Sequence, residues 1–95
     1  MLNITLNHLN GMWFTGDQRG SMWIGDDKQQ KVEIIYDRHI LVSEEIRFEY
    51  LDQPNIYKLS DSVLFYQIYD ENSIRIRVSY NDETIDFDFD RRKRR

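Results

Sequence analysis

Apolar and polar residues alternate along this chain, and the alternation is clearest near the C-terminus. Residues 73–80 and 85–90 carry an apolar residue at every second position, and these residues are Ile74, Ile76, Val78, Tyr80, Ile85, Phe87 and Phe89. A period of two places successive side chains on opposite faces of a β-strand. The pattern therefore predicts two strands, each with one face in a hydrophobic core.

These two strands are expected to form a hairpin around residues 81–82, because Asn and Asp tolerate the positive φ angles of tight turns. A two-residue turn pairs Ile76 with Phe87 and sets Arg77 opposite Asp86. A four-residue turn shifts the partners by two positions and keeps both faces. An odd-length turn needs a bulge to avoid placing apolar residues opposite charges, so the register is well constrained.

A third strand is predicted over residues 63–69, paired with the strand at 73–80. We assign Leu64, Tyr66 and Ile68 to the inward face, so Phe65 is expected to point outward.

Two further strands are predicted over residues 45–51 and 56–59, on either side of a turn. Ile46, Phe48 and Tyr50 share one face of the first strand, and charged residues occupy the other. We therefore expect these three side chains to point into the core.

Short alternating segments separated by polar turns also occupy residues 11–42. A meander of strands with one apolar face must either stack as two sheets or close on itself, and closure removes exposed edges. We predict an all-β fold, an eight-stranded antiparallel up-and-down barrel, with a two-sheet sandwich as the alternative. Residues 1–90 form this single domain, and residues 91–95 form a basic C-terminal tail.

Composition supports a strand-rich fold and narrows the chemistry. The 95 residues include eleven Ile, four Val and thirteen aromatic residues but no Ala, which favours strands over helices. The sequence has no Cys, which excludes disulfides, thiolate metal sites and a cysteine nucleophile.

Charge is distributed unevenly along the chain. The net charge is −4, and residues 91–95 are all basic, so residues 1–90 carry −9. An acidic body argues against a nucleic-acid-binding surface, and the basic tail is read as a solvated terminus, with an anionic partner as the alternative. No apolar stretch is long enough for a membrane span. If Met1 is the native start, the sequence predicts a cytoplasmic protein, although a secreted protein without its leader would look the same.

The residues Gly11-Met12-Trp13 open the first expected strand. This Gly-x-Trp pattern resembles the signature of the calycin superfamily, the lipocalins and their small lipocalin-like relatives. In that family the Trp closes one end of an eight-stranded barrel and packs beneath an Arg that follows the last strand. The resemblance implies these roles for Gly11, Trp13 and Arg91, with the Arg91 guanidinium over the face of Trp13 as a cation–π pair. It also implies that the barrel carries a small apolar ligand.

Asp86, Asp88 and Asp90 place three carboxylates on one face of the last strand, and hard cations prefer such oxygen ligands. An extended strand spreads its ligands apart, however, and Arg75 and Arg77 stand opposite to pair with them. We therefore expect ion pairs and no metal site.

His8 and His39 are the only candidates in the sequence for a base that works near neutral pH. Neither lies in a recognisable motif, and no serine has the context of a nucleophile elbow. We therefore expect no enzyme activity and no cofactor.

Inward-facing aromatic residues are the candidate ligand-binding set, and these are Phe48, Tyr50, Tyr57, Tyr66 and Phe87. Tyr hydroxyls would supply the few polar contacts that an apolar pocket needs. The alternative is a filled core, because an eight-stranded barrel of short strands is only just wide enough for its own side chains.

Two functional hypotheses follow from the sequence. The first is a non-enzymatic barrel that binds a small apolar or aromatic ligand. The second is a protein-interaction module or homodimerising domain with a filled core, which docks through an outer face that includes Leu51, Val63 and Phe65. The interior volume of the folded barrel distinguishes the two.

Overall fold

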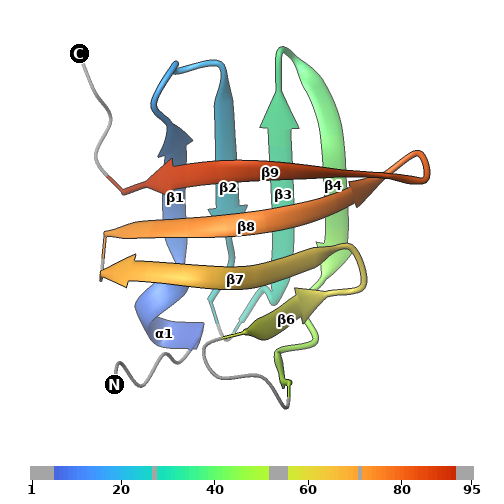
Figure 1. The fold of residues 1–95 in the computed structure, drawn as a ribbon. Helices are drawn as coiled ribbons and strands as arrows, with labels where there is room; N and C mark the ends of the chain where they lie inside the picture. The colour runs from blue at the N-terminus through green and yellow to red at the C-terminus, as the bar shows by residue number, and fades with distance from the viewer. Residues whose placement is uncertain (1–5, 27, 52–55, 71, 92–95) are drawn as a thin grey trace.

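The computed structural model describes residues 6–26, 28–51, 56–70 and 72–91, which form one short helix and a set of antiparallel strands (Figure 1). The elements in chain order are α1 (Leu6–Leu9), β1 (Gly11–Thr15), β2 (Gly20–Ile24), β3 (Lys31–Tyr36), β4 (His39–Glu45), β5 (Glu49–Tyr50), β6 (Tyr57–Ser60), β7 (Val63–Asp70), β8 (Ser73–Tyr80) and β9 (Glu83–Asp90). Among these residues, no helix has the length and apolar character needed to cross a membrane.

The strands form one nearly closed barrel. Their order is β4-β3-β2-β1-β9-β8-β7-β6-β5, and β4 and β5 follow each other in the chain. Residues 39–50 therefore act as one bent strand, which pairs with β3 at its start and with β6 at its end. At the bend, the Arg47 N–H donates to the Leu59 carbonyl of β6 at 2.7 Å. With this bent strand counted once, the predicted all-β, eight-stranded antiparallel up-and-down barrel is confirmed.

The C-terminal hairpin has the register predicted for a two-residue turn. Residues 81–82 both have positive φ angles, 50° and 62°, as a type I′ hairpin turn requires. Ile76 lies opposite Phe87 in the core. On the outer face, Arg77 Nε donates to Asp86 Oδ1 at 2.9 Å.

A hydrophobic core occupies the space between the rear wall, β1–β4, and the front wall, β6–β9, which cross each other (Figure 1). The large side chains that are fully buried include Trp13, Met22, Ile24, Ile34, Leu59, Phe65, Ile74, Ile76 and Phe89. Helix α1 covers one end of this core. Leu9 in α1 is buried, and its carbonyl accepts a hydrogen bond from Trp13 Nε1 at 2.8 Å.

The predicted inward face of β7 is wrong for most of the strand. Val63 and Phe65 are fully buried, whereas Leu64 and Tyr66 are only half-buried and lie on the outer side. The outer docking face predicted to include Leu51, Val63 and Phe65 therefore loses two of its three residues to the core.

A break in the strand pairing accounts for the face of β7. The register of β7 against β8 shifts between Phe65 and Gln67, and it returns Ile68 to the position opposite Ile74. Because residues 63–69 are apolar or aromatic at nearly every position, alternation alone did not identify the inner face.

The strand predicted over 45–51 is interrupted. Glu45 ends β4 opposite Lys31, and only Glu49–Tyr50 form a further strand, because the chain bends between them to pass from one neighbour to the other. Ile46 is buried and Phe48 packs against the core, so the inward direction of these two side chains is confirmed. The side chain of Tyr50 lies outside the described residues.

Candidate functional site

A pocket of about 670 Å³ opens at the end of the barrel away from α1, among the β1–β2 turn, the β3–β4 turn and the β8–β9 hairpin (Figure 1). We call it the mouth pocket, and its lining residues are Thr15, Gly16, Asp17, Tyr36, Asp37, His39, Leu41, Tyr80, Ile85, Asp86, Phe87 and Asp88. Its volume lies within the range of small-molecule sites, roughly 300–1,000 Å³. It is the candidate functional site.

The pocket exists because the rear wall of the barrel reaches further at this end than the front wall does. The strands of the rear wall run past β9, which is the last strand of the front wall on this side (Figure 1). β9 pairs with β1 at two positions, Phe14 with Asp90 and Thr15 with Phe89. Beyond them β9 diverges from β1, and the inner side of the β3–β4 hairpin stays uncovered.

Tyr36 forms the wall of the pocket on β3. Its ring centroid lies 5.2 Å from that of Phe87 on β9. Gly20, which is opposite Tyr36 on β2, makes room for the ring, since a Cβ added at Gly20 would lie 2.7 Å from Tyr36 Cδ1. The glycine therefore lets an aromatic ring lie directly against the backbone of β2.

Asp17 places a negative charge at the rim. Its carboxylate accepts hydrogen bonds from Thr15 Oγ1 at 2.6 Å, Tyr36 Oη at 2.7 Å and the Arg19 backbone N–H at 3.0 Å. These bonds, with that from Thr15 the strongest, lower the pKa of Asp17 from 3.8 to about 2. The bond to Asp17 also raises the pKa of Tyr36. At neutral pH, Asp17 is therefore ionised and Tyr36 carries its proton.

Three further carboxylates at the pocket are each paired with an arginine that is not part of the lining. The distances from Nε to the carboxylate oxygen are 2.6 Å for Arg19–Asp37, 2.7 Å for Arg75–Asp88 and 2.9 Å for Arg77–Asp86. The arginine bonds lower the pKa of both Asp86 and Asp88. No Lys or Arg belongs to the lining within the described residues, but these three arginines offset the charges of Asp37, Asp88 and Asp86.

The structure separates the aromatic residues that were predicted to share a ligand site. Phe87 lines the mouth pocket. Phe48 and Tyr57 instead stack on each other, with ring centroids 5.4 Å apart, where β5 pairs with β6. The predicted cluster is therefore divided between the mouth pocket and the region of β5 and β6.

Tyr66 is a correction to the predicted site. It lies on the outer face, where its hydroxyl donates to Asp86 Oδ2 at 2.9 Å and its ring centroid lies 4.7 Å from Arg77 Cζ. The bulge in β7 is the cause, because it interrupts the alternation that placed Tyr66 inside. The side chain of Tyr50, the last member of the set, lies outside the described residues.

Sequence reasoning missed four apolar residues of the lining, Tyr36, Leu41, Tyr80 and Ile85. A usable signal was present, since Tyr80 and Ile85 follow the inward alternation beside a predicted turn. Inward residues next to the turns of a barrel lie near its rim. What the pattern did not show is that β9 would leave this rim uncovered.

Gly11, Trp13 and Arg91 come together at the start of β1. Arg91 Cζ lies 4.3 Å from the ring of Trp13, and Arg91 Nη1 donates to the Asn10 carbonyl at 2.9 Å. Gly11 has a φ of 109°, a conformation that favours glycine. The predicted contact between Arg91 and Trp13 is therefore present. The rest of the predicted tail, residues 92–95, lies outside the described residues.

The aspartates of β9 make ordinary polar contacts. Asp86 and Asp88 are in the arginine pairs given above, and Asp90 accepts a hydrogen bond from Ser73 Oγ at 2.5 Å. In the described part of the chain, no three His, Cys, Asp or Glu side chains are grouped closely enough to hold a metal ion. His39 is exposed at the rim of the pocket, and His8 is exposed in α1.

Comparison of the chain with protein-family models, with curated proteins and with solved structures found no match.

Proposed function

We propose that this chain is a non-enzymatic, lipocalin-like barrel that binds a small apolar or aromatic ligand in the mouth pocket. The observation that carries the proposal is the pocket of about 670 Å³ at the open end of the barrel. Five of its lining side chains are apolar or aromatic, namely Tyr36, Leu41, Tyr80, Ile85 and Phe87. Such walls, with a few polar groups among them, are typical of small-molecule sites.

The architecture supports a ligand that enters from one end. Leu9, Trp13 and Arg91 pack together at the other end, and the core between the two ends is filled with buried side chains. A ligand would therefore bind between this core and the solvent, in contact with Phe87 and Tyr36.

The chemistry of the lining supports binding without catalysis. A nucleophile needs a base within hydrogen-bond reach. The lining has one imidazole, His39, and one hydroxyl of a Ser or Thr, Thr15. The Thr15 hydroxyl donates to Asp17 at 2.6 Å and accepts from the Gly20 N–H at 2.9 Å. Because the pKa of Asp17 is lowered to about 2, this carboxylate is a weak base, and we assign these hydrogen bonds to holding the β1–β2 turn.

The test uses N-phenyl-1-naphthylamine, a neutral aromatic probe whose fluorescence rises in apolar surroundings. We expect the probe to bind the wild-type protein. Ile85→Trp adds a large side chain to the pocket wall and should weaken probe binding about tenfold or more. Ile40→Trp is the matched control, because Ile40 is 65% exposed and is not part of the lining.

Two results would contradict the proposal. The first is that the wild-type protein does not bind the probe. The second is that Ile85→Trp and Ile40→Trp reduce binding equally, which would place the probe elsewhere. Thermal melting of both variants checks that they are folded.

A second candidate function is homodimerisation through the outer face of β1–β4. Met12, Ile35 and Ile40 are 44%, 36% and 65% exposed on this face, and Ile35 lies opposite Ile40. Adjacent exposed apolar residues, such as Ile35 and Ile40, can contribute to an interaction surface. Sedimentation equilibrium tests the candidate: we expect a dimer that Ile40→Lys converts to a monomer, and a monomeric wild-type protein would refute it.

A further inference from the structure

The edge of β9 that borders the mouth pocket has no neighbouring strand over most of its length. β8 pairs with β9 from Glu83 to Asp90 on one side. On the other side, within the described residues, β1 pairs with β9 only at Phe89 and Asp90. The consecutive residues Ile85, Asp86, Phe87 and Asp88 line the pocket, so the wall of the pocket here is the edge of the strand.

The hydrogen-bond pattern of the hairpin shows which backbone groups face this edge. In a two-residue hairpin the residues that flank the turn form a hydrogen-bonded pair, and such pairs then occur at every second position. Two hydrogen bonds show which positions these are. Ser79, which lies opposite Thr84, donates its N–H away from β9 to the Ser62 carbonyl, and Arg91, just after β9, donates its N–H across the hairpin to the Asn72 carbonyl. Thr84 and Asp86 therefore point their N–H and C=O groups away from β8.

A strand added at this edge would also cover apolar surface. It would lie beside β9 and over the part of the rear wall that extends past β9 (Figure 1). Its inward side chains would meet Tyr36, Leu41 and Phe87, which line the pocket. An added strand would therefore use both the backbone groups of the edge and the volume of the pocket.

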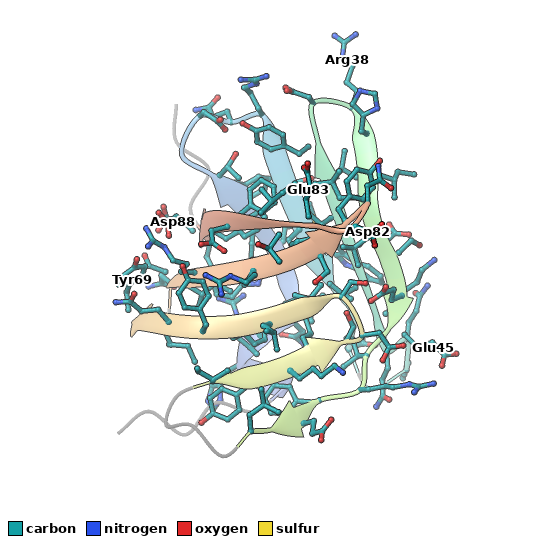
Figure 2. All side chains as sticks on the ribbon, turned by 45° about the vertical axis from the view of Figure 1, so that its right-hand side comes forward. Arg38, Glu45, Tyr69, Asp82, Glu83 and Asp88 are labelled. Carbon is teal, nitrogen blue, oxygen red and sulfur yellow. The ribbon has the colours of Figure 1, made fainter. Side chains whose placement is uncertain are left out.

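Charge selects the kind of strand that fits. Asp82 and Glu83 are exposed at one end of the free edge and Asp88 lies near the other (Figure 2), with Asp86 between them. Asp86 and Asp88 already form ion pairs with Arg77 and Arg75, so the net negative charge at this edge comes from the exposed Asp82 and Glu83. A cross-strand neighbour with basic side chains would be attracted to this end of the edge, and one with acidic side chains would be repelled. A second copy of β9 would bring its own Asp82 and Glu83 to the same edge, so pairing of β9 with itself is disfavoured.

We propose that the free edge of β9 binds an extended peptide as an additional strand, in which basic residues alternate with apolar ones. The basic side chains lie on the outer face, where the exposed Asp82 and Glu83 leave a net negative charge, and an apolar side chain enters the mouth pocket. This inference rests on the proposed function, because the apolar side chain takes the place of the ligand. Strand addition is a common mode of peptide recognition, in which the backbone supplies affinity and the pockets supply specificity.

The test uses acetyl-Lys-Leu-Lys-Phe-Lys-amide and two isomers that differ only in backbone N-methylation. One isomer is methylated at the Leu and Phe nitrogens, and the other at the nitrogens of the second and third Lys. In an added strand, one of these sets faces β9 and the other faces solvent. We expect the parent peptide to displace N-phenyl-1-naphthylamine, one isomer to bind roughly tenfold or more weakly, and the other isomer to bind like the parent.

Hydrogen exchange provides a second measurement on the intact protein. Binding of the parent peptide should slow exchange at the Thr84 and Asp86 amides. The charge-reversed peptide acetyl-Glu-Leu-Glu-Phe-Glu-amide should neither bind nor slow these amides, because the carboxylates at the edge repel it.

The outcomes separate this inference from the proposed function. If the neutral probe binds but the parent peptide does not displace it, the inference fails and the proposed function stands. If neither binds, both fail. Equal affinities of the two N-methyl isomers would also overturn the inference, as would protection of Thr84 and Asp86 that grows with protein concentration in the absence of peptide. The last result would indicate pairing between two copies.

Discussion

Arg91 lies over the indole of Trp13, with its Cζ 4.3 Å from the ring, although the two residues come from opposite ends of the chain. The indole is completely buried, and the guanidinium also donates to the Asn10 carbonyl. Burial lowers the pKa of Arg91, which is far too high for the group to lose its proton. A charged group thus covers the edge of the core and ties the end of β9 to the start of β1.

We predict that Trp13 and Arg91 act as one structural unit. Trp13→Ala should lower the free energy of unfolding by about 3–5 kcal/mol, because it leaves a large cavity. Arg91→Ala should cost about 1 kcal/mol, from lost stacking and packing. Because Arg91 has no ring to cover once the indole is gone, a double-mutant cycle should give a coupling of at least about 0.5 kcal/mol. Urea denaturation of the four proteins measures this coupling.

Arg47→Ala is the control for removal of an arginine, since Arg47 is exposed. It should be nearly neutral in both the wild-type and the Trp13→Ala backgrounds. Strict additivity of Trp13→Ala and Arg91→Ala would contradict the prediction.

A second prediction concerns the inner face of β7. Phe65→Ala should cost about 3–5 kcal/mol, because Phe65 is fully buried. Tyr66→Ala removes a contact with Arg77 and a hydrogen bond to Asp86 on the outer face, and it should cost about 1 kcal/mol. Denaturation of the two variants compares them, and a larger cost for Tyr66→Ala would restore the face expected from simple alternation.

The contrast between β9 and β7 shows how far the sequence determines the fold. In β9 every apolar residue is followed by a charged one, as in Phe87-Asp88-Phe89. Shifting β9 against β8 by an odd number of residues would therefore turn its aspartates into the core, and only even shifts keep them outside. In β7 the run from Val63 to Tyr66 is apolar or aromatic at every position. Either face of β7 would bury apolar area, and only tertiary packing and the bulge after Phe65 decide between them.

The closed end of the barrel was also more predictable than the open end. Trp13 and Arg91 could be linked through a short motif and the inward alternation of the last strand. The mouth pocket depends instead on where β9 separates from β1, after Phe89 pairs with Thr15. That separation arises from the twist and crossing of whole strands, and no local pattern around Tyr36 indicates it.

A third prediction concerns the glycines that flank β2. A Cβ added at Gly25 would lie 1.8 Å from the Gln29 carbonyl oxygen, a backbone atom that cannot move aside easily. Gly25→Ala should therefore destabilise the protein by about 2 kcal/mol or more. Gly16→Ala is the matched control, because a Cβ there meets no atom within 4 Å. It should be neutral within about 0.5 kcal/mol, and equal costs in urea denaturation would contradict the local geometry.

The last prediction concerns the charge of Asp17 at the mouth pocket. Its pKa falls from 3.8 to about 2 in the folded protein, because Thr15, Tyr36 and the Arg19 N–H donate hydrogen bonds to the carboxylate. A lowered folded-state pKa stabilises the protein above the unfolded pKa, and this stabilisation disappears as the pH falls through the folded pKa. The melting temperature of Asp17→Asn should therefore be lower than that of the wild type at about pH 6. This difference in melting temperature should shrink between about pH 4 and pH 2. Thermal melting across this range measures the difference, with Asp61→Asn, an exposed residue outside the pocket lining, as the control for loss of one carboxylate. A difference that stays constant down to about pH 2 would show that the hydrogen bonds at the rim do not favour the ionised form of Asp17.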